Sequence, residues 1–314
     1  MKLQIFLSDL PEYMDAMAAD KGMLRMFARG RVQWLNTSCE AYLCQQFGIK
    51  KQQDWPLAVL ARLGERVPVD GAYWMLASPV HFSLQRDSFV LARPAPLALH
   101  LQESEALRIS LNRHFAGAGL EFLPGAQGHW HLRLSSVPAL STTAVETVAG
   151  HDVASWLPQG EDAQHWRQLL NEMQMLLFDH EVNQAREARG ELAVNSVWLH
   201  GGGILPSPSE TAACKVYGEN ATLKGMAQLA GVSHAAVATL RTVMQEGPPH
   251  AVLQSPYVGL GNEWCELLWQ ALKARRVREV DLYFPWSHRM LHVQLRPADV
   301  FKFWRKPIAL ETYF

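Results

Sequence analysis

The stretch of sequence that decides the fold covers residues 161–206 and reads EDAQHWRQLLNEMQMLLFDHEVNQAREARGELAVNSVWLHGGGILP. Its first part predicts a long helix, because apolar residues recur at helical spacing on one face, namely Trp166, Leu169, Leu170, Met173, Leu176 and Leu177. A polar connector follows over residues 180–190 and stops at Gly190. Residues 194–199 then predict a strand, and Gly201–Gly203 predicts a turn. A strand that leads into a glycine turn is how α/β folds place backbone amides beside a ligand.

This stretch also supplies the candidate ligand-binding residues, which are Asn183, Arg186, Arg189, Asn195, Gly201, Gly202 and Gly203. Arg186 and Arg189 are three positions apart, so both can project from one helical face toward an anion. The alternative for these residues is a solvated helix end, and as part of a connector Arg186 is expected to contribute little to folding. The alternative for the glycines is a tight strand exit, since they match neither a dinucleotide fingerprint nor a P-loop.

Composition sets the broad class of the protein. The chain has 314 residues, of which 48% are apolar, and a formal net charge of −1. It is long enough for one large or two ordinary domains, and its charge balance gives no support for nucleic acid as a partner. No apolar run approaches membrane-spanning length, so no membrane partner is expected. Acidic Asp9 and Glu12 interrupt any amino-terminal targeting segment, which favours a cytoplasmic location with reduced cysteines.

The rest of the chain predicts an α/β protein in three parts. Short helices are expected in a helical amino-terminal part over residues 1–69, among them 14–29, 38–47 and 57–63. An α+β subdomain is expected over residues 70–150, with strands at 72–76 and 89–91, a helix at 103–115 and a hairpin at 119–122 and 129–134. Helices alternate with short apolar strands after residue 195. An α/β core with a largely parallel sheet is therefore expected over residues 151–314.

Two histidines of the predicted hairpin are possible metal ligands. His129 and His131 are two positions apart on a strand, so their side chains face the same side. No carboxylate motif accompanies them in the sequence. We therefore expect no metal site there.

Several motifs of the central stretch resemble those of a known family; they are Asn171-Glu172, His180-Glu-Val-Asn183, Arg186, Arg189-Gly190, Asn195, Trp198-Leu-His-Gly-Gly-Gly203, Pro206 and the segment 223–231. Together they resemble the archaeal-type cofactor-independent phosphoglycerate mutases of the alkaline-phosphatase superfamily. The likeness is weaker over residues 73–90 and 120–125. Residues 166–177 and 194–203 are also similar to proteobacterial proteins labelled regulatory proteins of RpfE type.

The resemblance implies an alkaline-phosphatase/phosphoglycerate-mutase-like core with an α+β inserted subdomain. The chemistry of the mutases would require a hydroxyl nucleophile and Asp/His clusters that hold two divalent metal ions. This chain departs from that pattern at both ends. The amino-terminal carboxylates Asp9, Asp15 and Asp20 do not form the Asp-Gly-x-Gly-Asp motif. Likewise, the segment from Asp281 to His288 has no second acidic residue beside the histidine.

Three functions remain open on the sequence. The first is a non-catalytic, regulatory pseudoenzyme without a cofactor that binds a phosphorylated metabolite or a protein partner. The second is an active phosphoglycerate mutase, or another phosphoryl-transfer enzyme, whose ligands for two divalent metal ions have been relocated. The third is a structural or assembly protein.

Overall fold

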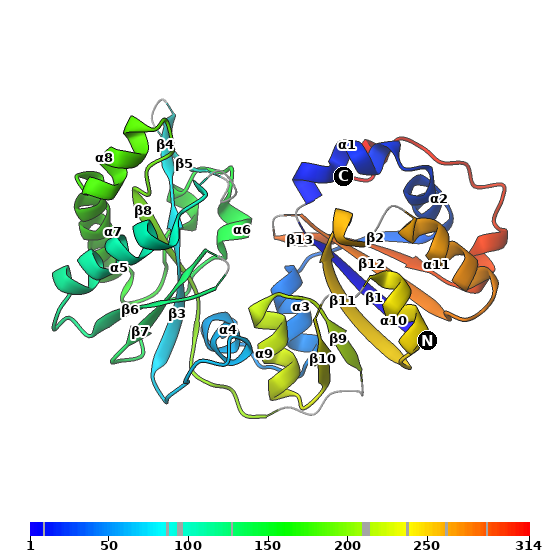
Figure 1. Ribbon diagram of the computed structural model, residues 1–314, viewed down its shortest axis with the longest axis horizontal. Helices are drawn as coiled ribbons and strands as arrows, with labels where there is room; N and C mark the ends of the chain where they lie inside the picture. Colours follow the sequence, from blue (N-terminus) through cyan, green and yellow to red (C-terminus); the bar gives the residue numbers. More distant parts are fainter. Residues whose placement is uncertain are drawn as a thin grey trace. The chain divides into compact units, whose positions relative to one another are not determined.

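The computed structural model describes residues 1–8, 10–85, 88–92, 97–126, 128–208, 214–236, 239–260, 263–286 and 288–314 (Figure 1). The chain forms two compact units. Unit 1 joins Met1–Gly48 to Pro208–Phe314, and unit 2 is Ile49–Ser207. The mixed α/β fold class is confirmed, and unit 2 is inserted between the two halves of unit 1.

The boundaries of the units correct the predicted division into residues 1–69, 70–150 and 151–314. Residues 151–207 belong to the same unit as residues 70–150. The physical reason is that β8 (Ser196–Gly203) pairs with β3 (Tyr73–Val80) in one sheet, although more than 100 residues separate them in sequence.

The sheet of unit 1 is mostly parallel, as predicted. Its strand order is β10-β9-β11-β1-β12-β13-β2, in which the pairs β12–β13 and β13–β2 are antiparallel and the other pairs are parallel. The strands are β1 (Lys2–Ser8), β2 (Arg31–Leu35), β9 (Lys215–Tyr217), β10 (Ser233–Ala235), β11 (His250–Pro256), β12 (Glu279–Trp286) and β13 (Arg289–Leu295). The helices are α1 (Leu10–Ala19), α2 (Lys21–Arg29), α3 (Cys39–Gln46), α9 (Ala221–Leu229), α10 (Leu240–Glu246) and α11 (Trp264–Lys273), with 3-10 turns η3 (Tyr257–Leu260), η4 (Pro297–Phe301) and η5 (Leu310–Thr312).

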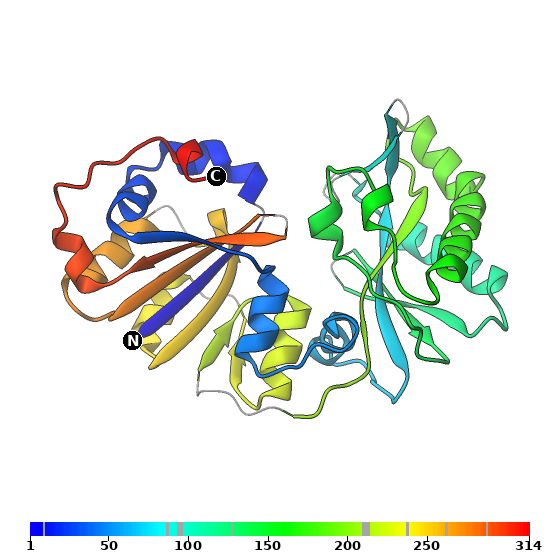
Figure 2. The same ribbon diagram turned by 180° about the vertical axis from the view of Figure 1, so that it is seen from behind.

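Strand β1 corrects the prediction that the amino-terminal part is helical. It lies between β11 and β12 and pairs parallel with both (Figure 2). Its alternate side chains Leu3, Ile5 and Leu7 join the main core of unit 1, and Phe6 on the other face packs against Tyr42 of α3. A strand buried on both faces tends toward a near-continuous apolar run instead of an alternating pattern, so it gives little periodic signal.

Asp20 divides the predicted helix 14–29 into α1 and α2. Its backbone is extended at φ −80° and ψ 103°, and its carboxylate accepts hydrogen bonds from the backbone amides of Gly22 and Met23. An aspartate in this position satisfies amides that the first turn of a helix leaves free. It therefore starts a new helix instead of continuing the old one.

Unit 2 is built on a four-stranded antiparallel sheet of order β6-β7-β3-β8, beside a small β4-β5 hairpin. Its remaining strands are β4 (Phe82–Gln85), β5 (Ser88–Leu91), β6 (Leu120–Pro124) and β7 (Trp130–Leu134). Its helices are α4 (Leu57–Gly64), α5 (Leu101–His114), α6 (Val145–Val148), α7 (Ala163–Phe178) and α8 (Glu181–Ala188), with the 3-10 turn η2 (Ala154–Trp156). The predicted hairpin is confirmed as β6 and β7.

The two faces of this sheet are covered by different helices. Helices α5 and α7 pack on one face, where their apolar residues join Met75 of β3 and Leu132 of β7 in one core. Helix α4 covers the other face, where the Arg62 guanidinium lies 3.8 Å from the centre of the Trp74 ring. Both views show α5, α7 and α8 along the same side of the sheet (Figures 1 and 2).

Helix α7 is the long helix that the spacing predicts. Five of the six residues of its predicted apolar face are buried, and Leu176 is partly buried. In the part of the chain that the structure describes, no helix combines the length and apolar composition needed to cross a membrane.

Candidate functional site

The three glycines of the central stretch form the end of strand β8, which corrects the predicted turn. The register of β8 against β3 shifts between the pairs Leu76–His200 and Trp74–Gly203, which marks a β-bulge. Gly201 adopts a positive φ of 66° at this bulge, a conformation that glycine takes without strain. The glycines thus belong to an irregular part of the strand and do not form a turn after it.

Close packing gives a second reason for glycine at these positions. A Cβ atom on Gly201 would lie 2.9 Å from Leu57 Cβ, and one on Gly203 would lie 2.6 Å from Pro56 Cβ. A Cβ atom on Gly202 would collide with the hydroxyl group of Tyr73 and lie 2.9 Å from two of its ring carbons. Real Cβ atoms do not approach other carbons so closely. The glycines therefore let the start of α4 and the Tyr73 ring approach β8.

We expect Gly202→Ala to lower the free energy of unfolding by about 1–3 kcal/mol, because the added methyl group overpacks the contact with Tyr73. Gly71→Ala is the matched control, since Gly71 has no neighbouring atom within 4 Å of the added Cβ. Its effect should stay within about 0.5 kcal/mol. Urea denaturation of both variants measures the difference, and equal stabilities would contradict the close contact at Gly202.

Three of the candidate ligand-binding side chains are engaged with the backbone of unit 2. Asn183 is 1% exposed; its amide donates to the carbonyls of Leu177 and Val194, and its oxygen accepts from the Val194 amide. Asn195 bridges the amide and the carbonyl of Phe82 in the same way. Such bonds satisfy buried backbone groups that no strand partner reaches.

The third is Arg186, which is completely buried in α8. Its guanidinium donates to Glu103 Oε2 at 2.6 Å, to the Leu192 carbonyl at 2.9 Å and to the Leu97 carbonyl. Contrary to the sequence-based expectation that it contributes little to folding, Arg186 joins three segments of unit 2. An arginine can do so because its donors point in several fixed directions.

Arg189 is the exposed member of the candidate set. Its side chain is 45% exposed and pairs with Glu103 and Glu191. Burial disfavours the ionised form of Glu103, but hydrogen bonds from the His100 amide and the two arginines outweigh it and lower the pKa of Glu103. A ligand anion at Arg189 would therefore compete with two carboxylates.

The candidate residues do not gather in one place. Gly201 and Gly203 face the start of α4, whereas Arg186 bonds to segments on the α5 side of the sheet. Their predicted contact with a ligand stays a prediction. Their observed contacts belong to the fold.

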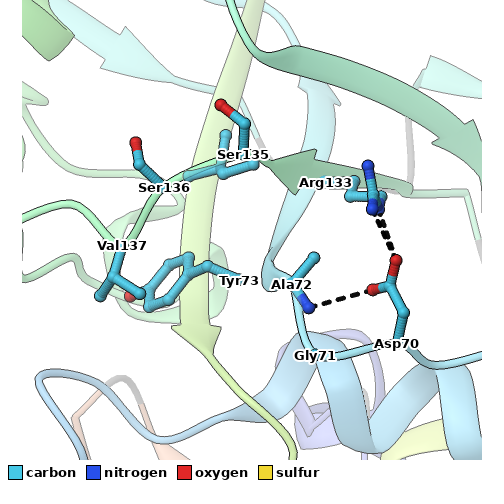
Figure 3. A pocket seen from close by; sticks show the side chains of 9 residues that line it. Asp70, Gly71, Ala72, Tyr73, Arg133, Ser135, Ser136 and Val137 are labelled. Carbon is cyan, nitrogen blue, oxygen red and sulfur yellow. Dashed lines mark hydrogen bonds and ion pairs between the residues drawn. The ribbon is translucent and has the colours of Figure 1, made fainter.

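A surface pocket of about 330 Å³ lies elsewhere in unit 2. It is lined by Asp70, Gly71, Ala72, Tyr73, Arg133, Leu134, Ser135, Ser136 and Val137. Figure 3 shows the Asp70–Arg133 pair on one side and the Tyr73 ring and Val137 on the other. Arg133 donates to Asp70 Oδ2 from Nε at 2.8 Å and from Nη2 at 2.6 Å. The two charges offset each other, so the pocket offers hydroxyl and amide groups rather than net positive charge.

Asp54 is a buried acid that sequence reasoning missed. Its side chain accepts two hydrogen bonds at 3.0 Å from the Thr142 amide and another from the Thr142 hydroxyl. Burial raises the pKa of Asp54, and these bonds only partly oppose the shift. Burial and the nearby Asp54 charge also raise the pKa of Tyr73. No local motif marks Asp54, because its partner lies 88 residues away.

Comparison with known protein sequences gives partial matches only. No protein-family model matches the chain. In an alignment 166 positions long, the chain is 27% identical to the 2,3-bisphosphoglycerate-independent phosphoglycerate mutase of Methanosarcina mazei, and the match covers 49% of the chain and 41% of that protein. Over 61 residues it is 43% identical to the 2,3-bisphosphoglycerate-independent phosphoglycerate mutase 2 of Methanothermobacter thermautotrophicus, and this match spans 19% of the chain and 15% of the relative. The chain is thus distantly similar to these mutases and matches less than half of their length.

Two solved structures align over most of the chain. The cofactor-independent phosphoglycerate mutase from Thermoplasma acidophilum has a TM-score of 0.44 and 14% identity to the chain. The alignment includes 100% of the chain and 95% of that mutase. A protein from Pyrococcus horikoshii covers 94% of the chain, with 87% of its own length, a TM-score of 0.47 and 13% identity.

Proposed function

We propose that this chain is a phosphoglycerate-mutase-like protein without mutase turnover, which acts in regulation by binding a phosphorylated small molecule or a protein partner. The regulatory part of the proposal follows the resemblance to the proteins of RpfE type. The mutase-like part follows the partial sequence matches.

The proposal rests on one observation. The motif residues through which the chain resembles the mutases make structural contacts within unit 2. Asn183, Arg186 and Asn195 hydrogen-bond to backbone groups of unit 2. Gly201 and Gly203 allow the start of α4 to pack closely, and Gly202 does the same for the Tyr73 ring. These residues explain a shared scaffold without requiring a shared reaction.

The carboxylates near the two ends of the chain support the same proposal. Asp20 caps α2 and also accepts a hydrogen bond from the Tyr257 hydroxyl at 2.8 Å. Asp281 pairs with His292 Nε2 at 2.8 Å inside the sheet of unit 1. Asp9 lies outside the described residues. Two metal ions close together need several carboxylates to offset their charge, and Asp20 and Asp281 are each engaged in separate structural contacts.

A mutase assay tests the absence of turnover. We expect no interconversion of 3-phosphoglycerate and 2-phosphoglycerate above a buffer control when Mn²⁺ or Zn²⁺ is supplied. Product formation that disappears on adding a chelator would instead establish the enzyme.

A thermal-shift series tests the binding part of the proposal. A phosphorylated ligand such as 3-phosphoglycerate should raise the melting temperature, because a ligand at 100 times its Kd stabilises the native state by about 2.7 kcal/mol. Arg189→Ala should reduce that shift if the exposed arginine contacts the ligand. Arg296→Ala, which changes an exposed arginine of unit 1, should leave the shift unchanged. The absence of a shift with every phosphorylated compound tried would argue for a protein partner.

A further inference from the structure

Three side chains of unit 2 converge although they are far apart in sequence. Glu65 directly follows α4, His131 lies in β7, and His129 immediately precedes that strand. Glu65 Oε2 lies 2.9 Å from His131 Nε2, and Glu65 Oε1 lies 3.6 Å from His129 Nε2. One ligand atom from each of the three residues lies within 4.8 Å of the other two. The carboxylate that the sequence around the histidines lacks is therefore supplied by the residue that follows α4.

We propose that Glu65, His129 and His131 form a binding site for a single divalent transition-metal ion of the zinc type. This site is separate from the phosphorylated-ligand binding proposed above. It is also separate from any two-metal site of phosphoryl-transfer enzymes.

The spacing of the donor atoms fits such an ion. Bonds of about 2.0–2.1 Å in tetrahedral geometry place neighbouring ligand atoms about 3.3–3.4 Å apart. The distance from Glu65 Oε2 to His131 Nε2 is 2.9 Å, somewhat below that value, and the 3.6 Å distance to His129 Nε2 is measured from the other carboxylate oxygen, Oε1. Small side-chain movements would therefore bring these atoms to coordinating distance. Two imidazoles and one carboxylate favour zinc, cobalt or nickel over magnesium and calcium, which prefer oxygen ligands.

An unpartnered buried nitrogen points to a ligand. His129 Nε2 is buried and has no hydrogen-bond partner among the described residues, since 3.6 Å to Glu65 exceeds hydrogen-bond distance. Buried polar side-chain atoms normally have a partner, so such an atom calls for an explanation. A structural Glu65–His131 ion pair would need no second imidazole. A metal ion would use the free lone pair of His129.

The surrounding fold holds the three donors in place. The Ala126 amide donates to Glu65 Oε1 at 3.1 Å and fixes the carboxylate against the β6–β7 hairpin. A Cβ atom on Gly125 would lie 3.0 Å from His131 Nε2, so glycine at this position lets the imidazole pack close to the hairpin. The His131 side chain is fully buried, whereas those of His129 and Glu65 are 15% and 10% exposed. The cluster is therefore mostly buried and reaches solvent at His129 and Glu65.

The donor set also predicts the form of the site. Three protein ligands leave the fourth tetrahedral position open to water or another small ligand. His131 and Arg133 are two positions apart in β7, so their side chains face the same side of the sheet, and His129 directly before the strand keeps the same spacing. The site thus belongs to the face of the sheet that α4 covers.

The experiment uses the untagged full-length chain, stripped of metal by a chelator and titrated with Zn²⁺ against a chromophoric competitor. We expect one ion to bind per chain. Removing a donor in His129→Ala or Glu65→Gln should weaken binding at least about tenfold, since even the outer contacts of metal ligands change affinity about 10–100-fold. His165→Ala removes an exposed histidine of the same unit and should leave the affinity unchanged.

Cobalt substitution of the unaltered protein gives an independent measurement. Its visible absorption should have the intensity of a four-coordinate nitrogen and oxygen site, and this signal should disappear in His129→Ala. Circular dichroism of each variant establishes that it is folded. If one variant does not fold, the other variant and the cobalt spectrum decide the matter. The proposal is overturned if the unaltered chain binds no zinc at micromolar concentrations. It is also overturned if the folded variants bind zinc as tightly as the unaltered chain does.

Discussion

Replacing Arg186 with alanine is expected to lower the free energy of unfolding by about 3–5 kcal/mol, which is the usual effect of removing one partner of a buried ion pair. The Arg186 side chain is 1% exposed, and its partner Glu103 is 14% exposed. The substitution also removes the donors to the carbonyls of Leu97 and Leu192. Buried acceptors without a donor retain their full desolvation cost. Urea-induced unfolding followed by circular dichroism measures the change.

Arg189→Ala is the matched control for this prediction. Arg189 belongs to the same helix end and pairs with the same carboxylate, but its side chain is 45% exposed. Exposed ion pairs contribute about 0–1 kcal/mol, so this variant should unfold almost as the unaltered chain does. If the two variants lose equal stability, Arg186 does not hold the segments of unit 2 together.

Leu177→Ala is expected to lower the free energy of unfolding by about 2–5 kcal/mol. Leu177 has no exposed surface and lies in the core formed by α5, α7 and the four-stranded sheet. Alanine would remove its methyl contacts and leave a cavity, because packed neighbours relax only partly. Guanidinium-induced unfolding measures the loss, when the variant and the unaltered chain are fitted with the same dependence of the unfolding free energy on denaturant concentration.

The neighbouring residues of α7 provide controls with similar helix propensity. Leu176 is partly buried, so Leu176→Ala should cost less than Leu177→Ala. Met175 is 76% exposed, and Met175→Ala should change stability by no more than about 0.5 kcal/mol. A different order of the three variants would show that the buried face of α7 is assigned incorrectly.

The sequence by itself determined the elements whose signal is local. The helical spacing from Trp166 to Leu177 predicted α7, and the apolar segments on either side of Pro124 and Gly125 predicted the β6–β7 hairpin. The alternation of helices and strands after residue 195 predicted the mostly parallel sheet. In each case, neighbouring residues alone specify which face is buried, so periodicity is sufficient.

Only the tertiary structure decided which distant segments meet. Strand β1 became central because β11 and β12 flank it, and its apolar run alone does not distinguish a strand from a helix. Gly202 is required because the Tyr73 ring packs against it, although 129 positions separate them in the printed sequence. Glu65 reaches His131 across 66 positions, which no local pattern records. Side-chain contacts of this kind depend on the whole packed chain, so the polar partners of Arg186 and the candidate metal ligands follow from the fold rather than from spacing.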